Sequence, residues 1–251
     1  MHGVDVVPVS VTGSRERPSA QPDSGTRDAV LTPSIIVAPG PRVDSGLDRH
    51  REFYVKPAHC LLAPAGTLPY RPDLGTLSYR AQLGFILEPT DRFTPPAQIL
   101  SRVRGLVAAA EVVSIDRLEV GWEGTMWHIR YGEGGAFDGA CPIGPSMARI
   151  GAGDSLPEQL EGLRLTDAWG SFGIDVGDVA SFLGYVNRWL RLGPEVLVLS
   201  GAGHGPRLRL DGQQPTVVFD EREPRVRAGG MITVEAGILG AIGVQIGGLD
   251  S

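Results

Sequence analysis

The sequence predicts a β-rich α+β fold with a few short helices, and two observations support this prediction. The chain of 251 residues contains 35 Gly and 20 Pro, residues that interrupt long helices and favour strands joined by turns. From residue 51 onward, short apolar runs alternate with Gly, Pro or Asp, which is typical of successive short strands.

The expected strands are apolar runs bounded by turn residues. Residues 32–37 (TPSIIV) form the first strand of the core, and residues 39–48 read as a loop. The later strands are expected at residues 83–87, 127–131, 196–199, 217–219, 231–236 and 241–246.

Two segments show apolar residues at helical spacing. Residues 96–110 carry Ile99, Val103, Leu106 and Val107 on one face. In residues 175–192 the same spacing links Val179, Phe182, Leu183, Val186 and Leu190. Asp178 can cap or charge the first turn of that second helix.

Composition divides the chain near residue 30. Residues 1–30 are rich in Ser, Pro, Asp, Arg and Gly, so they cannot bury enough apolar area to offset their ordering entropy. We expect a flexible N-terminal tail that is dispensable for folding, although residues 4–11 could form one strand. Residues 31–251 then form one domain, and a hydrophobic content of 42% is enough for a real core.

The net charge of −6 argues against a nucleic-acid or anionic-membrane partner, which would need a basic face. No signal-peptide pattern and no apolar run of membrane length is visible, so we expect a cytoplasmic protein. The two cysteines, Cys60 and Cys141, are few for a disulfide framework, and Cys141 is expected to be a small buried hydrophobe. Lys56 is the only lysine, so any mechanism that needs a lysine depends on it.

Several segments share, in order and spacing, the pattern of one enzyme superfamily. They are residues 53–57 (FYVKP), 79–86 (YRAQLGFI), 107–116 (VAAAEVVSID), 137–145 (FDGACPIGP), 192–205 (LGPEVLVLSGAGHG) and 230–246. Together they span roughly residues 50–250 and resemble the fumarylacetoacetate hydrolase superfamily. The resemblance implies a mixed β-sheet roll, a homodimer and a cleft that binds a small oxo-acid.

The same resemblance implies a metal site that this chain has lost in large part. Family members hold Mg²⁺ or Mn²⁺ with carboxylates, the ligands that hard cations prefer, and the metal polarises the substrate. Here the two glutamates of the family's Glu-x-Glu strand correspond to Arg80 and Gln82, and the metal aspartate corresponds to Glu111. Because a guanidinium repels a divalent cation at contact range, we expect no metal and no cofactor.

Other family positions differ as well. The active-site lysine corresponds to Gly135, and the arginine of Ala-Arg-Asp to Ile115, although Asp116 remains. Ser200 and Ala202 correspond to the two threonines of the Thr-Gly-Thr-Pro loop. The lid His and Glu that activate water have no clear counterpart, although His50 and Glu52 lie near that region.

The candidate catalytic residues are therefore Arg80, Glu111 and Asp116. Arg80 can bind a carboxylate or enolate bidentately, and Glu111 could serve as a general base; the structural alternative is an ion pair between the two. The candidate substrate-binding residues are Tyr54, Lys56, Gln82, Ser200 and His204, the last in a Gly-rich loop. His59 and His128 are expected to be structural.

Three functions remain open. The first is metal-independent isomerisation, decarboxylation, cyclisation or C–C cleavage of a small oxo-acid, β-dicarbonyl or enolisable compound, possible in specialised metabolism, because all of these pass through an enolate-like state. The second is a catalytically inactive subunit or binding protein that keeps the fold. The third is a metal-dependent C–C hydrolase with relocated ligands such as Asp116 or Asp138.

Overall fold

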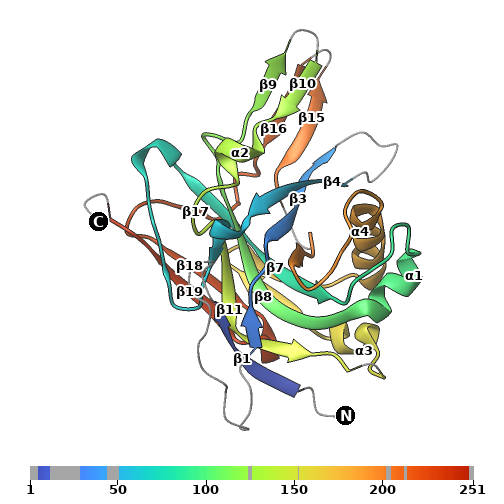
Figure 1. The fold of residues 1–251 in the computed structure, drawn as a ribbon. Helices are drawn as coiled ribbons and strands as arrows, with labels where there is room; N and C mark the ends of the chain where they lie inside the picture. Colours follow the sequence, from blue (N-terminus) through green and yellow to red (C-terminus); the bar gives the residue numbers. More distant parts are fainter. Residues whose placement is uncertain are drawn as a thin grey trace.

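Strands dominate the computed structural model of the protein, and α1, α3 and α4 gather on one side of them (right in Figure 1). The structure describes residues 5–11, 29–43, 51–123, 126–151, 153–201, 205–211 and 214–248. The helices are α1 (Pro96–Ile99), α2 (Tyr131–Gly134), α3 (Leu156–Leu160) and α4 (Val176–Trp189), and short 3₁₀ turns lie at Ala58–Cys60, Pro72–Leu74, Leu100–Arg102 and Gly237–Leu239.

The largest sheet curls through the centre of the molecule. Its strands are β1 (Asp5–Val11), β2 (Ala29–Leu31), β3 (Ile35–Val43), β4 (Arg51–Pro57), β5 (Leu61–Leu62), β7 (Leu77–Leu87), β8 (Val103–Ser114), β11 (Cys141–Arg149), β14 (Val196–Leu199), β15 (Arg207–Asp211), β16 (Gln214–Val218) and β17 (Arg225–Val226). Within the described residues, nine of them follow the order β16-β15-β3-β14-β7-β8-β11-β1-β2, while β4, β5 and β17 pair with β3, β11 and β7. Parallel and antiparallel pairs both occur, as the expected mixed sheet requires.

Two smaller sheets complete the fold. The first contains β6 (Thr67–Leu68), β12 (Arg164–Asp167), β13 (Gly170–Gly173), β18 (Met231–Glu235) and β19 (Ala241–Ile246), in the order β13-β12-β18-β19-β6. The second is a hairpin of β9 (Val120–Glu123) and β10 (Met126–Ile129). This hairpin and the β15–β16 hairpin project together at the top of Figure 1, where β9 contacts β16. The predicted β-rich roll is confirmed.

The pair β7–β8 is the centre of the sheet. The two strands run antiparallel along their full length, from Leu77 opposite Ser114 to Leu87 opposite Val103. Nearly every residue of both strands is buried, so both faces of the sheet are covered. A polar side chain on either strand therefore lies inside the protein and needs a partner there.

The predicted helix over residues 96–110 is wrong. The helix ends at Ile99, a 3₁₀ turn follows, and β8 begins at Val103. Because β8 is buried on both faces, its apolar residues form a continuous run without the alternation of a half-exposed strand. Such a run satisfies the helical spacing by chance.

The second predicted helix is confirmed as α4. It buries Val179, Phe182 and Leu183 in the hydrophobic core, and each such side chain contributes about 1.5–3 kcal/mol when fully buried. The cap is Asp175, whose side chain accepts a hydrogen bond of 2.7 Å from the backbone N–H of Asp178. Asp178 itself lies in the first turn, where its charge suits the helix dipole.

The strand predictions hold best near the C-terminus. Residues 196–199 and 241–246 match β14 and β19 at both ends, and β18 stops one residue before the predicted end.

The predicted loop at residues 39–48 is wrong for residues 39–43, which continue β3. A register shift between Pro39 and Arg42 accommodates the Pro-Gly-Pro sequence within that strand.

The N-terminal segment contains the strand that the sequence allows. β1 pairs antiparallel with β11 and parallel with β2, and Val7 is 1% exposed. This differs from a tail that is mobile throughout residues 1–30, since the apolar residues of 5–11 are enough to join a sheet. Residues 1–4 and 12–28 lie outside the described part of the chain.

Deleting residues 1–28 is therefore expected to destabilise the protein. The deletion removes β1 from the edge of β11, and the loss of Val7 burial alone costs about 1.5–3 kcal/mol. Thermal unfolding followed by circular dichroism checks this, with deletion of residues 1–4 as the control because it keeps β1. Equal melting temperatures for the long deletion and the full chain would support the original expectation of a dispensable segment.

No helix in the described part of the chain is long and apolar enough to cross a membrane.

Candidate active site

An ion pair between Arg80 and Glu111 lies at the centre of the sheet. The register of β7 and β8 places the two residues directly opposite each other. Arg80 donates through Nε to Glu111 Oε2 at 2.6 Å, and its Nη2 lies 2.5 Å from the same oxygen. The Glu111 side chain is fully buried and the Arg80 side chain is 15% exposed. Arg80 is therefore the partner that faces outward.

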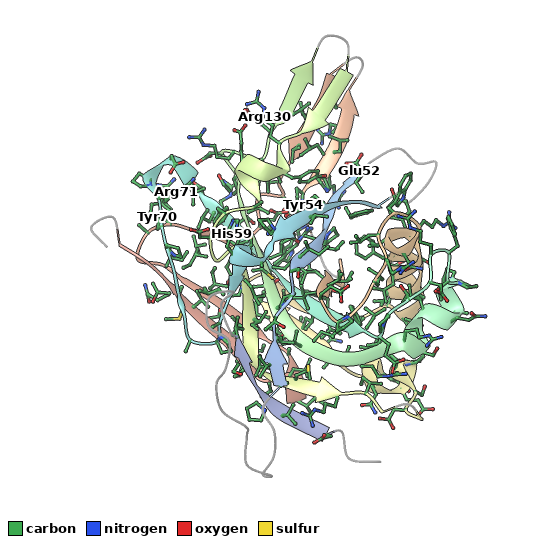
Figure 2. The ribbon with its side chains drawn as sticks, viewed as in Figure 1. Glu52, Tyr54, His59, Tyr70, Arg71 and Arg130 are labelled. Atoms are coloured by element: carbon green, nitrogen blue, oxygen red, sulfur yellow. The ribbon has the colours of Figure 1, made fainter. Side chains whose placement is uncertain are left out.

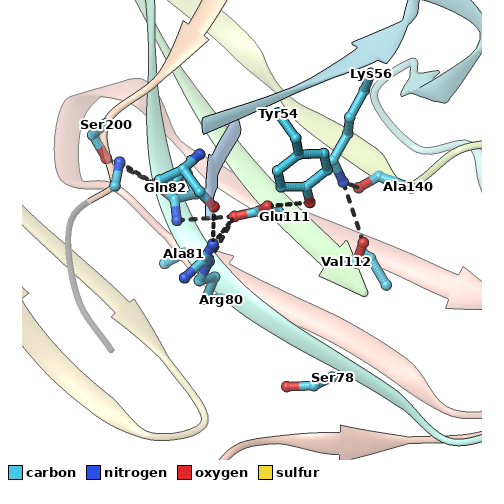
Figure 3. Close-up of polar contacts among 12 residues, drawn as sticks. Tyr54, Lys56, Ser78, Arg80, Ala81, Gln82, Glu111, Val112, Ala140 and Ser200 are labelled. Atoms are coloured by element: carbon cyan, nitrogen blue, oxygen red, sulfur yellow. Dashed lines mark hydrogen bonds and ion pairs between the residues drawn. The ribbon is translucent and has the colours of Figure 1, made fainter. Parts of the chain in front are cut away.

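The second oxygen of Glu111 is also occupied. Tyr54, on β4 (Figure 2), donates its hydroxyl to Glu111 Oε1 at 2.6 Å, and Figure 3 shows the carboxylate held between this phenol and Arg80. Burial, and then the charge of Glu111, raise the pKa of Tyr54 well above its usual value, so the phenol remains a donor. The Tyr54 ring stacks on Tyr131, with centroids 4.2 Å apart, which fixes its direction.

Gln82 and Ser200 lie beside the ion pair but bind each other. Gln82 Oε1 accepts from Ser200 Oγ at 3.0 Å and from the backbone N–H of Gly201 at 2.8 Å. The amide nitrogen of Gln82 lies 3.5 Å from Glu111 Oε2. Ser200 is 1% exposed and also accepts from the backbone N–H of Leu83. These contacts hold the end of strand β14 against β7. A contact of Gln82 or Ser200 with substrate remains a prediction.

Lys56 lies behind Tyr54 and does not line the cavity described below. Its side chain is fully buried, and Nζ donates to the backbone oxygens of Val112 at 3.3 Å and Ala140 at 3.2 Å (Figure 3). Burial lowers the pKa of Lys56.

Burial also raises the pKa of the Cys141 thiol to about 12, which fits the prediction of an inert, buried cysteine.

The predicted catalytic residue Asp116 does not lie at the ion pair. Asp116 lies exposed in the turn after β8, where its Oδ2 accepts from the backbone N–H of Thr76 at 2.8 Å. Asp116 therefore stabilises the turn that follows β8, five residues after Glu111. His204 lies outside the described residues, as does His50.

A small cavity opens over Arg80. It has a volume of about 10 Å³, which is room for one water molecule. Gly205 lies directly against Arg80 Nη1, and even a Cβ at that position would collide with the guanidinium. The lining residues are Ser78, Tyr79, Arg80, Glu111, Val113, Asp167, Trp169, Gly205, Pro206 and Glu223.

Sequence reasoning missed five polar or aromatic residues of this cavity: Ser78, Tyr79, Asp167, Trp169 and Glu223. Asp167 Oδ2 accepts from the backbone N–H of Ala81 at 3.0 Å, and its Oδ1 accepts from that of Trp169 at 2.9 Å. Asp167 thereby joins the β12–β13 turn to β7 beside Arg80 and fixes the backbone at Trp169. The Asp-x-Trp-Gly pattern predicts a turn, but nothing in the sequence places that turn against β7.

The residues at this point do not fit a divalent cation of the kind the family resemblance implies. Three carboxylates line the cavity, but among the described residues Glu111 alone forms an ion pair with Arg80, and both of its oxygens already accept hydrogen bonds. The Arg80 guanidinium itself contacts the Glu111 carboxylate, and like charges at contact repel strongly. Elsewhere in the described chain, no three His, Cys, Asp or Glu side chains group as a metal site. Asp138, a candidate relocated ligand, lies 3.5 Å from His59 at the surface.

A family model described as "Fumarylacetoacetate (FAA) hydrolase C-terminal" matches residues 41–247. The chain belongs to the fumarylacetoacetate hydrolase family. This match confirms the resemblance of residues 50–250 described above. It covers the two strands that carry Arg80 and Glu111 as well as the C-terminal strands β18 and β19.

A curated relative is distant from this chain in sequence. This relative, 2,4-didehydro-3-deoxy-L-rhamnonate hydrolase of Sphingomonas sp. (strain SKA58), is 26% identical over 146 residues, which cover 56% of this chain and 47% of that relative. The chain thus matches about half the length of that protein.

Solved structures share the fold. 5-Carboxymethyl-2-hydroxymuconate delta-isomerase from Mycobacterium smegmatis aligns with a TM-score of 0.62 at 13% identity, over 86% of this chain and 78% of that one. Fumarylpyruvate hydrolase from Pseudomonas aeruginosa, in complex with Mn²⁺ and pyruvate, aligns with a TM-score of 0.59 at 18% identity, over 96% and 97%. Identities this low establish the architecture alone.

Proposed function

We propose that this fumarylacetoacetate hydrolase family member acts on a small oxo-acid, β-dicarbonyl or other enolisable compound, with Arg80 as the positive centre and without a divalent cation. The reaction class is an isomerisation, decarboxylation, cyclisation or C–C cleavage. All four pass through an enolate-like state, and a preorganised positive charge stabilises that state more than the ground state.

The observation that carries this proposal is the position of the Arg80 guanidinium. Nε and Nη2 bind Glu111, and Nη2 also donates to the backbone oxygen of Pro39 at 2.8 Å. Among the described residues, no acceptor binds Nη1, and this atom lies on the cavity side against Gly205. Glu111 and the Pro39 carbonyl hold the guanidinium in place, so a donor is fixed beside the cavity before any substrate binds.

These contacts support a specific division of roles. Arg80 Nη1 donates to the carboxylate or enolate oxygen of the substrate, and its charge is held in place by Glu111. Glu111 acts as a positioning residue, because its two oxygens accept from Arg80 and Tyr54 and neither is left to take a proton from substrate. Trp169 supplies an apolar wall to the same cavity, which strengthens the field of a fixed charge by excluding water.

Exchange of the methyl protons of pyruvate with D₂O tests the proposal. Pyruvate is a small 2-oxo-acid, and it is the compound bound in the Pseudomonas aeruginosa relative. Exchange requires enolisation and nothing further, so it reports the shared step of all four reaction classes. We expect the protein to accelerate exchange, as followed by ¹H NMR, in buffer treated with EDTA. Exchange at the rate of buffer alone, together with no detectable pyruvate binding, would contradict the proposal.

A second candidate function is a catalytically inactive family member that keeps the fold for binding or assembly. The size of the cavity favours it, because about 10 Å³ admits a water molecule but no oxo-acid unless Gly205 and Pro206 move. The exchange assay distinguishes the two candidates, since an inactive protein shows no acceleration even where pyruvate binds.

The proposal keeps two further expectations, a homodimer and a cytoplasmic location. The first rests on the family resemblance. A monomer mass in light scattering at micromolar concentration would contradict the first.

A further inference from the structure

Glu223 is a buried acid that faces the same cavity as Arg80. It lies just before β17, whose Arg225 pairs with Ser78 of β7. Ser78 and Arg80 are two residues apart on that strand, so their side chains share one face of the sheet. Glu223, Ser78 and Arg80 all line the cavity, although they come from segments about 140 residues apart in the chain.

The hydrogen bonding of Glu223 is incomplete. The residue is 6% exposed, and its Oε2 accepts from Ser78 Oγ at 3.1 Å. Its Oε1 is buried, and within the described residues it has no hydrogen-bond partner. A buried carboxyl oxygen without a partner costs about 1–3 kcal/mol. Such a group is retained at a functional site when a ligand or a proton supplies the missing partner.

Charges from several elements act on Glu223. Arg80 on β7 favours its carboxylate form, while Asp220 in its own segment disfavours it. Glu111 on β8 and Asp167 at the end of β12 also line the cavity, but both accept hydrogen bonds from other groups. Burial is the largest influence and raises the pKa of Glu223 above its usual value. The acid can therefore exist in both protonation states nearer to neutral pH than an exposed glutamate does.

We propose that Glu223 is the residue that transfers a proton between this cavity's ligand, a small oxo-acid held by Arg80, and the protein. This inference rests on the proposed function and deepens it by naming the acid–base group. It assigns to Glu223 the role that the sequence suggested for Glu111. The reason is geometric: both oxygens of Glu111 accept hydrogen bonds from Arg80 and Tyr54, whereas Glu223 lines the cavity and, within the described residues, has one carboxyl oxygen without a partner.

The proton transfer needs no other reactant. The Glu223 carboxylate takes a proton from the carbon next to the substrate carbonyl, and the C–H electron pair becomes the C=C bond. The carbonyl π pair moves to oxygen, and the resulting enolate oxygen accepts from Arg80. In the return step the Glu223 carboxyl gives its proton to that carbon, which restores C–H and C=O and leaves the carboxylate.

Glu223→Gln tests this assignment, with Glu221→Gln as the matched control. Glu221 lies in the same turn but is exposed, and both changes remove one charge without changing side-chain size. The readouts are pyruvate methyl exchange by NMR and pyruvate binding by calorimetry. We expect Glu223→Gln to bind pyruvate within about threefold of wild type but to exchange about 10²–10⁴-fold more slowly. Glu221→Gln should match wild type in both.

Other outcomes would overturn the inference. If Glu223→Gln exchanges pyruvate protons at the wild-type rate, Glu223 is not the base, although the proposed function stands. If it loses binding as well as exchange while remaining folded, Glu223 is a binding residue only. If wild type neither binds pyruvate nor accelerates exchange, the proposed function fails and this inference fails with it.

The pH dependence of exchange by the wild-type protein and by Ser78→Ala provides a test that does not require Glu223→Gln to fold. The active base is the carboxylate, so the exchange rate should fall as pH is lowered through the raised pKa of Glu223. The Ser78 hydroxyl stabilises the carboxylate, so Ser78→Ala should move this acidic limb to higher pH. An unmoved limb would contradict the role of Glu223.

Discussion

Replacing Arg80 with alanine is expected to lower the free energy of unfolding by about 3–5 kcal/mol. The change removes the charge that neutralises Glu111, whose side chain is fully buried between two covered faces of the sheet. The remaining donors, the Tyr54 hydroxyl and the Gln82 amide, are neutral, and they cannot offset the loss of a charged partner. Urea unfolding monitored by circular dichroism measures the effect.

The double variant Arg80→Ala with Glu111→Gln is the control for this result. Glutamine keeps the shape of Glu111 and can still accept from Tyr54, but it carries no charge. If the loss in Arg80→Ala comes from an uncompensated buried carboxylate, the double variant should regain much of the stability. A double variant that is as unstable as the single variant would show that Arg80 contributes by packing alone.

The catalytic effect of Arg80 is expected to be of similar size. The double variant Arg80→Ala, Glu111→Gln has no uncompensated buried carboxylate. Its rate of pyruvate proton exchange should be several hundred-fold below that of the wild-type protein. That factor corresponds to the loss of about 3–4 kcal/mol of transition-state stabilisation from one preorganised donor. Glu111→Gln alone keeps the guanidinium and should retain much more of the exchange rate, as measured in the same NMR assay.

Arg80→Lys separates charge from geometry. Lysine supplies a point charge without the planar fork, and it cannot bind Glu111 through two nitrogens while a third faces the cavity. We therefore expect Arg80→Lys to rescue little of the exchange activity. Wild-type exchange by the neutral double variant would end the catalytic claim for Arg80.

The pairing of Arg80 with Glu111 was accessible from the sequence because of the family resemblance. Segments 79–86 and 107–116 match the family's strands in order, and the antiparallel register of β7 and β8 then places the two residues opposite each other. The C-terminal strands were accessible from local pattern alone, because β18 and β19 alternate exposed and buried residues. Such alternation is the clearest strand pattern in a sequence.

The buried strand β8 and the complete cavity were not accessible in the same way. β8 lacks alternation because both of its faces are covered. Asp167, Trp169 and Glu223 reach the cavity through long-range packing of the β12–β13 turn and of β17 on β7. No short sequence motif predicts packing between segments so far apart in the chain. Conversely, Asp116 matches a family motif but lies in a turn that holds Thr76.

The Mn²⁺ dependence of pyruvate exchange tests the Arg80 centre most directly. Protein treated with EDTA and then titrated with Mn²⁺ is assayed for exchange and for bound metal at each step. We predict full exchange activity before any Mn²⁺ is added and no stoichiometric binding, because the Arg80 guanidinium repels a divalent cation and the Glu111 carboxylate already accepts from Arg80 and Tyr54. Exchange that appears only as about one Mn²⁺ binds per chain would contradict this prediction and would favour a metal site with relocated ligands.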